Sequence, residues 1–482
     1  MRSFRCARRS FCFASLNRGS GEQRHALFEE AASGEGRDRC SMTILQQGAS
    51  WKPRAAAWVA VAALLVCSGC AFWRHTSADG RTVLHVWSGW TGKEKDIFDG
   101  VVTAFNRSQN RYLLRNMSIE GDDTKTIRAL TAGVPSDLFF LWEPAYIGQL
   151  AANGAVVPLD DLLGRTGPRL GDFIPGSIGQ GLWEGKHYSL PYLVDAYAFY
   201  WDKDAFREVG LDPERPPRTL REVEAYALKL TKRDARGNIK RLGFQLPDIF
   251  HPIVWFGGRF YDPKAHRITA DYPRNIEALR WYVHMMDTQG GAINVESFAQ
   301  GFGEYASPNN QFFVGKVAMM ISGQWWPGFI QRFAPQMDYG VAPIPYPDQY
   351  PEQQGVTYLG GNFCCIPRES KHPAGAWAFM RWTQTFGGQE LFAKDMHGVP
   401  NIKVVLKDPV LVTGSRHNQA FGVVCKIASN PKARFFPATP VNIMYMSELI
   451  SAAQVASRKA KTPQQALTAV QRRVQRELDT YY

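Results

Sequence analysis

Apolar residues in the first part of the chain alternate between strand-like runs and helical spacing. Residues 82–87, 112–119 and 138–142 are short runs rich in β-branched, aromatic and other apolar side chains, which predicts three strands. Between them, apolar residues recur on one helical face over residues 97–105, and residues 124–132 predict a second, shorter helix. Strands that alternate with helices indicate α/β layers with parallel strands.

Residues 185–230 predict a strand, a proline-rich turn and a helix in succession. Thr219 stands three residues before Glu222, which is the spacing of a capping box, where each side chain satisfies a free backbone N–H at the helix start. The apolar residues of this predicted helix recur on one face, at Leu220, Val223, Ala227 and Leu230.

The end of the chain predicts a second capped helix. Thr462 and Gln465 have the spacing of a capping box, and Pro463 occupies the first helical position, where its missing N–H costs nothing. The apolar face of this helix consists of Leu467, Val470, Val474 and Leu478.

The N-terminal part of the chain carries an apolar run over residues 55–66, preceded by Lys52 and Arg54. The run has the length of a signal peptide and is too short to cross a hydrocarbon core of about 30 Å. It ends in Cys67-Ser68-Gly69-Cys70, which resembles a lipoprotein signal except that Cys67 stands where that motif normally has Leu. We expect Cys70 to be lipidated and to become the mature N-terminus, with simple signal cleavage or a retained anchor as the alternatives.

Residues 1–41 are rich in arginine and mixed in charge, unlike a targeting signal, so either Met1 or Met42 initiates the chain. The formal charge is +12, and removal of residues 1–69, with ten basic and five acidic side chains, lowers it to +7. The basic residues are dispersed among acidic ones, which argues against a nucleic-acid partner and favours a solvated surface that faces anionic lipid. The mature length exceeds what one hydrophobic core usually serves, so we expect two lobes.

Cysteine and histidine usage indicates neither a disulfide framework nor a metal site. After Cys70 only Cys364, Cys365 and Cys425 remain; either one of the adjacent pair bridges Cys425 or the thiols are buried and free. The spacing of cysteine and histidine matches no zinc motif. A Walker phosphate loop is also absent from the sequence, so the chain would not power transport itself.

The serial order of several short segments, rather than any single motif, resembles a known family. The segments read PSDLFFLW (135–142), LAANGAVVPLDDLL (150–163), GKHYSLPY (185–192), FFVGKVAMMISGQWWP (312–327), GVAPIP (340–345), GGNFCCI (360–366) and GVP (398–400). This order, over about residues 82–480, resembles the sugar-binding branch of bacterial extracellular solute-binding proteins of ABC importers, similar to maltose-binding protein. The chain departs at Trp201 and Asp202, where the family usually has Tyr and Asn.

The resemblance implies a two-lobed α/β periplasmic-binding-protein fold of type II, with discontinuous lobes joined by a hinge. The expected division is a leader (1–69), a tether (70–81), lobe 1 (82–192 and 359–403) and lobe 2 (193–358 and 404–482). It also implies an extracytoplasmic monomer that closes on a sugar and delivers it to permease subunits with a separate ATPase. No enzymatic activity, cofactor or metal is expected.

A buried sugar needs flat aromatic surfaces for its C–H faces and polar side chains for its hydroxyls. In open α/β sheets, ligands bind at loops beyond the carboxyl ends of strands. On this basis and on the resemblance, the candidate ligand-binding residues are Trp90, Trp142, Glu143, Asp195, Trp325, Trp326 and Asn362.

Each candidate also has a structural alternative. Trp90 would pack at the surface, Trp142 would pack at a strand end under its loop, and Asp195 would cap a hinge. Asn362 would belong to a turn, since Asn tolerates left-handed geometry. Of the adjacent pair Trp325 and Trp326, we expect one to face the ligand and the other the core, with Trp325 at the ligand. Asp122 and Asp123 are expected in a solvated loop, with a place at the cleft as the alternative.

Two other functions compete with sugar capture. A binding protein for glycerol phosphate or a polyamine would share the fold. An anionic ligand would be bound by Arg or Lys, and Lys93, near the first loop, leaves that alternative open. A secreted glycoside-active enzyme would need two carboxylates about the scissile bond, for which Glu143, Asp195 and Asp123 are available, although nothing in the sequence sets their separation.

Overall fold

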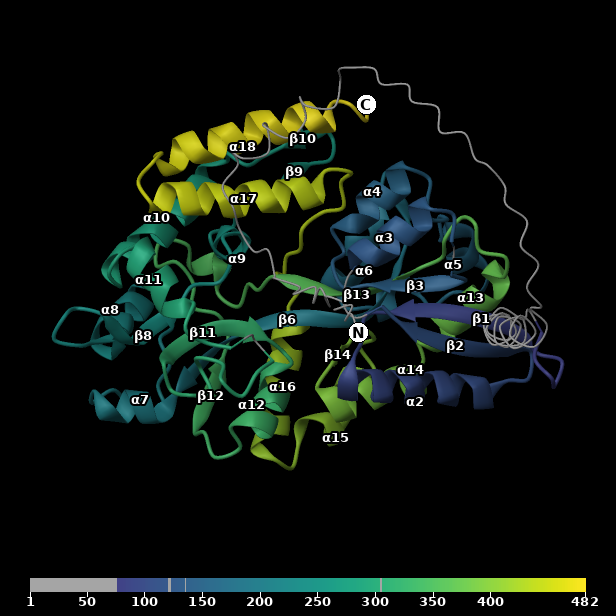
Figure 1. The fold of residues 1–482 in the computed structure, drawn as a ribbon, viewed down its shortest axis with the longest axis horizontal. Coiled ribbons are helices and arrows are strands. Elements are labelled where there is room, and N and C mark those ends of the chain that lie inside the picture. The colour runs from purple at the N-terminus through teal and green to yellow at the C-terminus, as the bar shows by residue number, and fades with distance from the viewer. Residues whose placement is uncertain (1–75, 120–122, 135, 304–305) are drawn as a thin grey trace, which may run out of the picture. The chain divides into compact units, whose positions relative to one another are not determined.

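The computed structural model describes residues 76–119, 123–134, 136–303 and 306–482, and their largest element is a mixed sheet of ten strands (Figure 1). The three strands predicted first are present as β1 (Thr82–Ser88), β2 (Tyr112–Ser118) and β3 (Leu138–Leu141). The strand β1 pairs in parallel with both β2 and β3, which confirms the predicted α/β layering for this part of the sheet. The intervening helices are α2 (Gly92–Ser108) and α3 (Asp123–Thr131).

The longest strand, β6 (Leu190–Asp202), lies in the middle of the sheet order β2-β1-β3-β13-β6-β11-β8-β7. Its first half pairs antiparallel with β13 (Leu359–Cys365) and its second half antiparallel with β11 (Val317–Gly323). The short strands that also pair with β6 are β12 (Tyr339–Ala342) and β14 (Val399–Pro400). The strand β6 therefore joins the two halves of the sheet.

The remaining strands are β7 (Lys232–Arg233) and β8 (Ile239–Gln245) in the large sheet, and the two-stranded pairs β4 (Leu182–Trp183) with β5 (Lys186–His187) and β9 (Tyr261–Asp262) with β10 (Arg267–Ile268). Helices cover both faces of the sheet (Figure 1). The other α-helices are α4 (Tyr146–Ala152), α5 (Asp160–Thr166), α6 (Pro175–Ile178), α7 (Lys203–Glu208), α8 (Leu220–Leu230), α9 (Phe250–Trp255), α10 (Pro273–Thr288), α11 (Ala292–Ala299), α12 (Trp326–Phe333), α13 (Pro373–Trp382), α14 (Phe386–Met396), α15 (Pro409–Val412), α16 (Arg416–Ala428), α17 (Asn442–Ser457) and α18 (Pro463–Leu478).

Both predicted helix caps form, with one difference. At α18 the box is reciprocal: the Gln465 N–H donates to Thr462 Oγ1 (3.2 Å) and the Thr462 N–H donates to Gln465 Oε1 (3.0 Å). At α8 the Glu222 N–H donates to Thr219 Oγ1, but the Glu222 carboxylate accepts from the Arg218 N–H (2.6 Å). The apolar faces predicted for both helices are buried.

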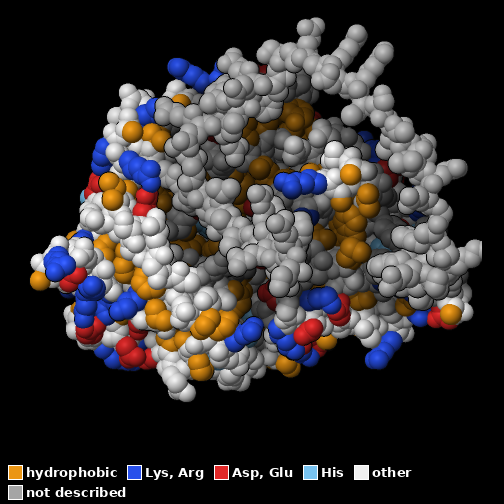
Figure 2. All heavy atoms as spheres, viewed as in Figure 1, with side chains coloured by type: hydrophobic (Ala, Val, Ile, Leu, Met, Phe, Trp, Pro, Cys, Tyr) orange, Lys and Arg blue, Asp and Glu red, His pale blue; other side chains and the backbone are white. Residues whose placement is uncertain are grey.

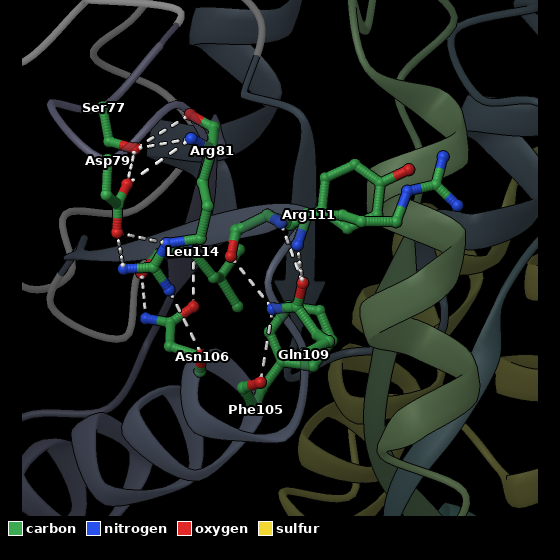
Figure 3. A network of polar contacts seen from close by, with 9 residues as sticks. Ser77, Asp79, Arg81, Phe105, Asn106, Gln109, Arg111 and Leu114 are labelled. Carbon is green, nitrogen blue, oxygen red and sulfur yellow. Dashed lines mark hydrogen bonds and ion pairs between the residues drawn. The ribbon is translucent and has the colours of Figure 1, made fainter.

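A network of polar contacts fixes the C-terminal end of α2 against β2 (Figure 3). The Asn106 side chain accepts from the Leu114 N–H (2.7 Å) and donates to the Leu114 carbonyl (2.9 Å). Gln109 Oε1 accepts from the N–H groups of Arg111 and Tyr112, both at 2.8 Å. These hydrogen bonds tie the C-terminal end of α2 to the strand that follows it.

The cysteines Cys364 and Cys365 on β13 and Cys425 on α16 are buried free thiols, so the disulfide alternative does not occur. Burial raises the pKa of Cys425 to about 12, which keeps this thiol protonated. The predicted features at residues 55–66, Met42 and Cys70 lie outside the described residues.

Charges of both signs are interspersed over the described residues on the face shown in Figure 2. None of the helices in the described ranges is both long and apolar enough to span a bilayer.

Candidate ligand-binding site

Five of the predicted site residues line one cavity of about 290 Å³. They are Trp90, Trp142, Asp195, Trp325 and Asn362. The cavity is open on one side and has a predominantly apolar wall, which is typical of a site that binds a small organic ligand.

The sheet topology explains why these residues meet. Because β1 and β3 are parallel neighbours, the loops after their carboxyl ends, which carry Trp90 and Trp142, lie at the same edge. The residue Asp195 pairs with Gly360 of β13, whereas Tyr197, two positions later, pairs with Gly323 of β11. Asp195 therefore occupies the point where β6 passes from one partner strand to the other.

The adjacent tryptophans have different environments. Trp325 lines the cavity and meets the ring of Tyr197 edge-on, at 5.9 Å between centroids. Trp326 is 1% exposed and packs against Phe313 (4.9 Å) and Phe329 (6.0 Å) in the core. Trp326 thus does not line the cavity, because as the first residue of α12 it points back into the apolar layer beneath the helix.

Trp90 is both a core residue and a wall of the cavity. It is 3% exposed, and its ring contacts Phe98 (4.5 Å), Phe392 (5.0 Å) and Phe140 (5.1 Å). Neighbouring rings thus hold the Trp90 indole plane in place before any ligand binds, which lowers the entropy cost of stacking on it.

Gln324 holds the Asp195 carboxylate in position. The Gln324 Nε2 donates to Asp195 Oδ1 (2.7 Å), and the Gln324 Oε1 accepts from the Ala196 N–H (3.1 Å). Burial raises the pKa of Asp195 to about 6, and the hydrogen bond from Gln324 opposes that shift. The second carboxylate oxygen, Oδ2, accepts no hydrogen bond from a residue in the described ranges.

Asp123, the first residue of α3, is 8% exposed rather than part of a solvated loop, so that expectation was wrong. Its carboxylate accepts from the backbone N–H groups of Trp142 (3.0 Å) and Glu143 (2.8 Å). It therefore fixes the loop that follows β3. The two backbone N–H groups need acceptors, and the Asp123 carboxylate supplies them. Asp122 lies outside the described residues.

Glu143 lies beside the cavity and is not one of the residues that line it. Its Oε1 accepts from the Ala145 N–H (3.0 Å). Burial raises the pKa of Glu143 to about 7; the hydrogen bond from Ala145 opposes the shift, and the nearby charges of Asp123 and Asp195 add to it.

Asn362 is part of strand β13 rather than of a turn. It pairs with Leu193 of β6, and the register shifts between Asn362 and Phe363. Such an irregularity re-aims side chains locally, and here the Asn362 side chain lines the cavity.

Glu94, Gln324, Phe329 and Phe392 also line the cavity and were missed in the sequence. Gln324 directly precedes the predicted site residue Trp325, and this position in the sequence could have identified Gln324 as a candidate. Phe329 and Phe392 have the periodicity of ordinary helix core residues. Glu94 stands next to Lys93, which the sequence suggested as a contact for an anionic ligand. Lys93 is exposed and does not line the cavity.

The sequence profile described as bacterial extracellular solute-binding protein matches residues 91–390, and the chain belongs to this family. A protein of Brucella abortus (strain 2308) named as a binding protein is 25% identical over 373 residues, which span 76% of this chain and 85% of that protein. The sn-glycerol-3-phosphate-binding periplasmic protein UgpB of the same strain is 28% identical over 162 residues, 32% of this chain and 37% of UgpB.

Solved structures agree with the family. The protein CpMnBP1 with mannobiose bound is 28% identical with a TM-score of 0.72, and the match covers 81% of this chain and 99% of that one. The sugar-binding protein MalE from Xanthomonas citri is 20% identical with a TM-score of 0.68, over 83% of this chain and 98% of MalE. The chain therefore has the two-lobed periplasmic-binding-protein fold of a bacterial extracellular solute-binding protein.

Proposed function

We propose that this protein captures a sugar or a short oligosaccharide in the aromatic cavity and delivers it to an ABC importer. The observation that carries the proposal is the convergence of three indole rings, Trp90, Trp142 and Trp325, with the polar side chains of Asp195 and Asn362 on one cavity. Aromatic faces stack on the C–H faces of a sugar ring, and the polar groups replace the hydrogen bonds that its hydroxyls make to water.

In this proposal Trp142 and Trp325 stack on the ligand, while Asp195, Asn362 and Glu143 bind its hydroxyls. The Trp142 indole N–H is buried and has no hydrogen-bond partner among the described residues, so it is available to a ligand hydroxyl. The cavity volume of about 290 Å³ is near the lower end of the usual range of about 300–1,000 Å³, which favours a ligand of one or two rings.

We propose that two lobes, residues 82–192 with 359–403 and residues 193–358 with 404–482, close about this cavity. The change of partner strand along β6 supports this division, because a strand shared by both halves can act as a hinge. The closed monomer would then dock on permease subunits, whose separate ATPase drives import.

Glycerol phosphate is the second candidate, since part of the chain is similar to UgpB. An anionic ligand needs Arg or Lys in the site, and the residues that line the cavity in the described part of the chain include neither. This lining favours a sugar over a phosphate.

We also propose that the protein is an extracytoplasmic lipoprotein anchored through Cys70. The support is the apolar run that ends in Cys67-Ser68-Gly69-Cys70, together with a family of extracellular binding proteins.

The test is thermal unfolding of the full chain against a panel of mono- and oligosaccharides, glycerol phosphates and polyamines. A ligand that binds only the folded state stabilises it by about 2.7 kcal/mol at a hundredfold excess over its dissociation constant. A rise in midpoint with an unmodified or amino-substituted saccharide supports the proposal. A rise only with a phosphate or a polyamine, or release of cleaved sugar, contradicts it.

A further inference from the structure

The cavity that we propose for a sugar is lined by two carboxylates, Glu94 in the first turn of α2 and Asp195 in the middle of β6. Glu143 adds a third carboxylate beside it. Glu94 and Asp195 come from separate parts of the chain, and the tertiary fold brings them to the same cavity as five aromatic rings, while Glu143 stays outside its lining.

Neither lining carboxylate forms an ion pair with a residue in the described ranges. Asp195 accepts one hydrogen bond, from the uncharged amide of Gln324. Glu94 makes no hydrogen bond or ion pair to any residue in the described ranges, although the exposed Arg332 on α12 acts on it electrostatically from a distance. Burial raises the pKa of both groups, which shows that water does not fully solvate their charges.

We infer that the ligand is a sugar that carries a protonated amine, which Glu94 and Asp195 neutralise; this inference rests on the proposed sugar-binding function. The hydroxyls of a neutral sugar can donate to the two carboxylates but leave their negative charge unbalanced on closure, whereas an ammonium group donates and also restores the balance of charge. A hydroxyl already makes a charge-assisted hydrogen bond to a carboxylate, and an ammonium group adds the attraction between opposite charges to it.

The aromatic wall supports the same ligand. A cation over the face of a tryptophan is attracted by the ring quadrupole, most strongly where water is excluded. Trp90, Trp142 and Trp325 offer such faces beside the two carboxylates, so one ring can stack on the sugar while another lies next to its ammonium group.

The test is isothermal titration calorimetry of the full chain with matched ligands. The pairs are glucosamine and glucose, mannosamine and mannose, and the disaccharide of chitosan with its N-acetylated form, in which the amine no longer carries a charge. We expect at least one amine to bind about tenfold or more tightly than its uncharged counterpart, because a tenfold change corresponds to about 1.4 kcal/mol.

Glu94→Gln and Asp195→Asn keep the shape of each side chain and remove its charge, and each should lower the preference for the amine. Asp96→Asn is the matched control, because Asp96 is exposed on the same helix and does not line the cavity; it should leave the preference unchanged. Asp195→Asn alters the contact to Gln324. If that variant has a lower thermal midpoint, Glu94→Gln alone tests the role of the carboxylates in the preference for the amine.

Equal or tighter binding of the uncharged sugars overturns the inference and leaves the proposed sugar-binding function intact. An amine preference that survives both substitutions also overturns it. If the same panel gives no heat with any saccharide and binding only with glycerol phosphate or spermidine, the proposed function itself is wrong, and the inference falls with it.

Discussion

Trp325 and Trp326 differ in environment although they are neighbours in sequence, and this difference predicts different effects of the same substitution. Trp325→Ala should weaken ligand binding by about tenfold or more, because it removes a stacking surface from the cavity. The fold should stay intact, since only one wall of an open cavity is lost. Unchanged affinity in calorimetry would remove Trp325 from the site.

Trp326→Ala is the matched comparison. Trp326 is buried between Phe313 and Phe329, so its removal leaves a large cavity in the core. The free energy of unfolding should fall by about 3–5 kcal/mol, measured by denaturant titration. A loss of similar size for Trp325→Ala would contradict the separate roles that we assign to the two rings.

Glu143 predicts a pH dependence of stability. Burial raises its pKa from the ordinary value of 4.5 to about 7 in the folded protein. Between these values the unfolded chain has already lost the proton that the folded chain still holds, so stability falls as pH rises, by about 3 kcal/mol in total. The loss is complete about one pH unit above the folded-state pKa, at pH ~8.

Glu143→Gln should remove this loss. The variant should be more stable than the parent at pH 8 and similar to it at pH 4, when unliganded unfolding is measured across that range. The amide oxygen of Gln can still accept from the Ala145 N–H, which keeps the loop contact. Asp195, whose pKa is about 6, remains in both proteins and contributes the same residual slope. Parallel curves for the two proteins would contradict the prediction.

At the scale of elements, capping residues and apolar spacing predicted helices well, because both signals act over only a few neighbouring residues. The helices α8 and α18 begin one residue after Thr219 and Thr462, and their buried faces are those that the apolar spacing indicates. The same spacing could not show that Glu94 lies at a cavity, because periodicity identifies a buried face and not what that face meets.

The cap of α18 gives the prediction at this scale. Thr462→Ala removes the acceptor for the Gln465 N–H and should lower the free energy of unfolding by about 1 kcal/mol. Ligand affinity should not change, because α18 contributes no residue to the cavity wall. The control Thr480→Ala, beyond the end of the helix, should change stability by less than about 0.5 kcal/mol. An equal loss for both variants in denaturant titrations would contradict a capping role.

At the scale of the whole molecule, the proposed anchor decides where the protein acts. Cys70→Ser removes the thiol that would carry the lipid, and it should move the protein from the membrane fraction to the soluble fraction. Cys67→Leu, which restores the residue usual in lipoprotein signals, should keep the protein in the membrane fraction. Fractionation with immunoblotting measures both, and a membrane-bound Cys70→Ser protein would contradict lipidation at this residue.

The sequence by itself determined the first three strands and the helices between them, the N-caps of α8 and α18, the family and most of the aromatic residues that line the cavity. These features follow from local propensity, apolar spacing and segment order, which are properties of neighbouring residues. Only the tertiary structure decided that Asp123 is buried and that Glu94 and Gln324 line the cavity. Those facts depend on contacts between residues far apart in the chain, above all on where β6 changes partner strands, and no local pattern encodes such a distance.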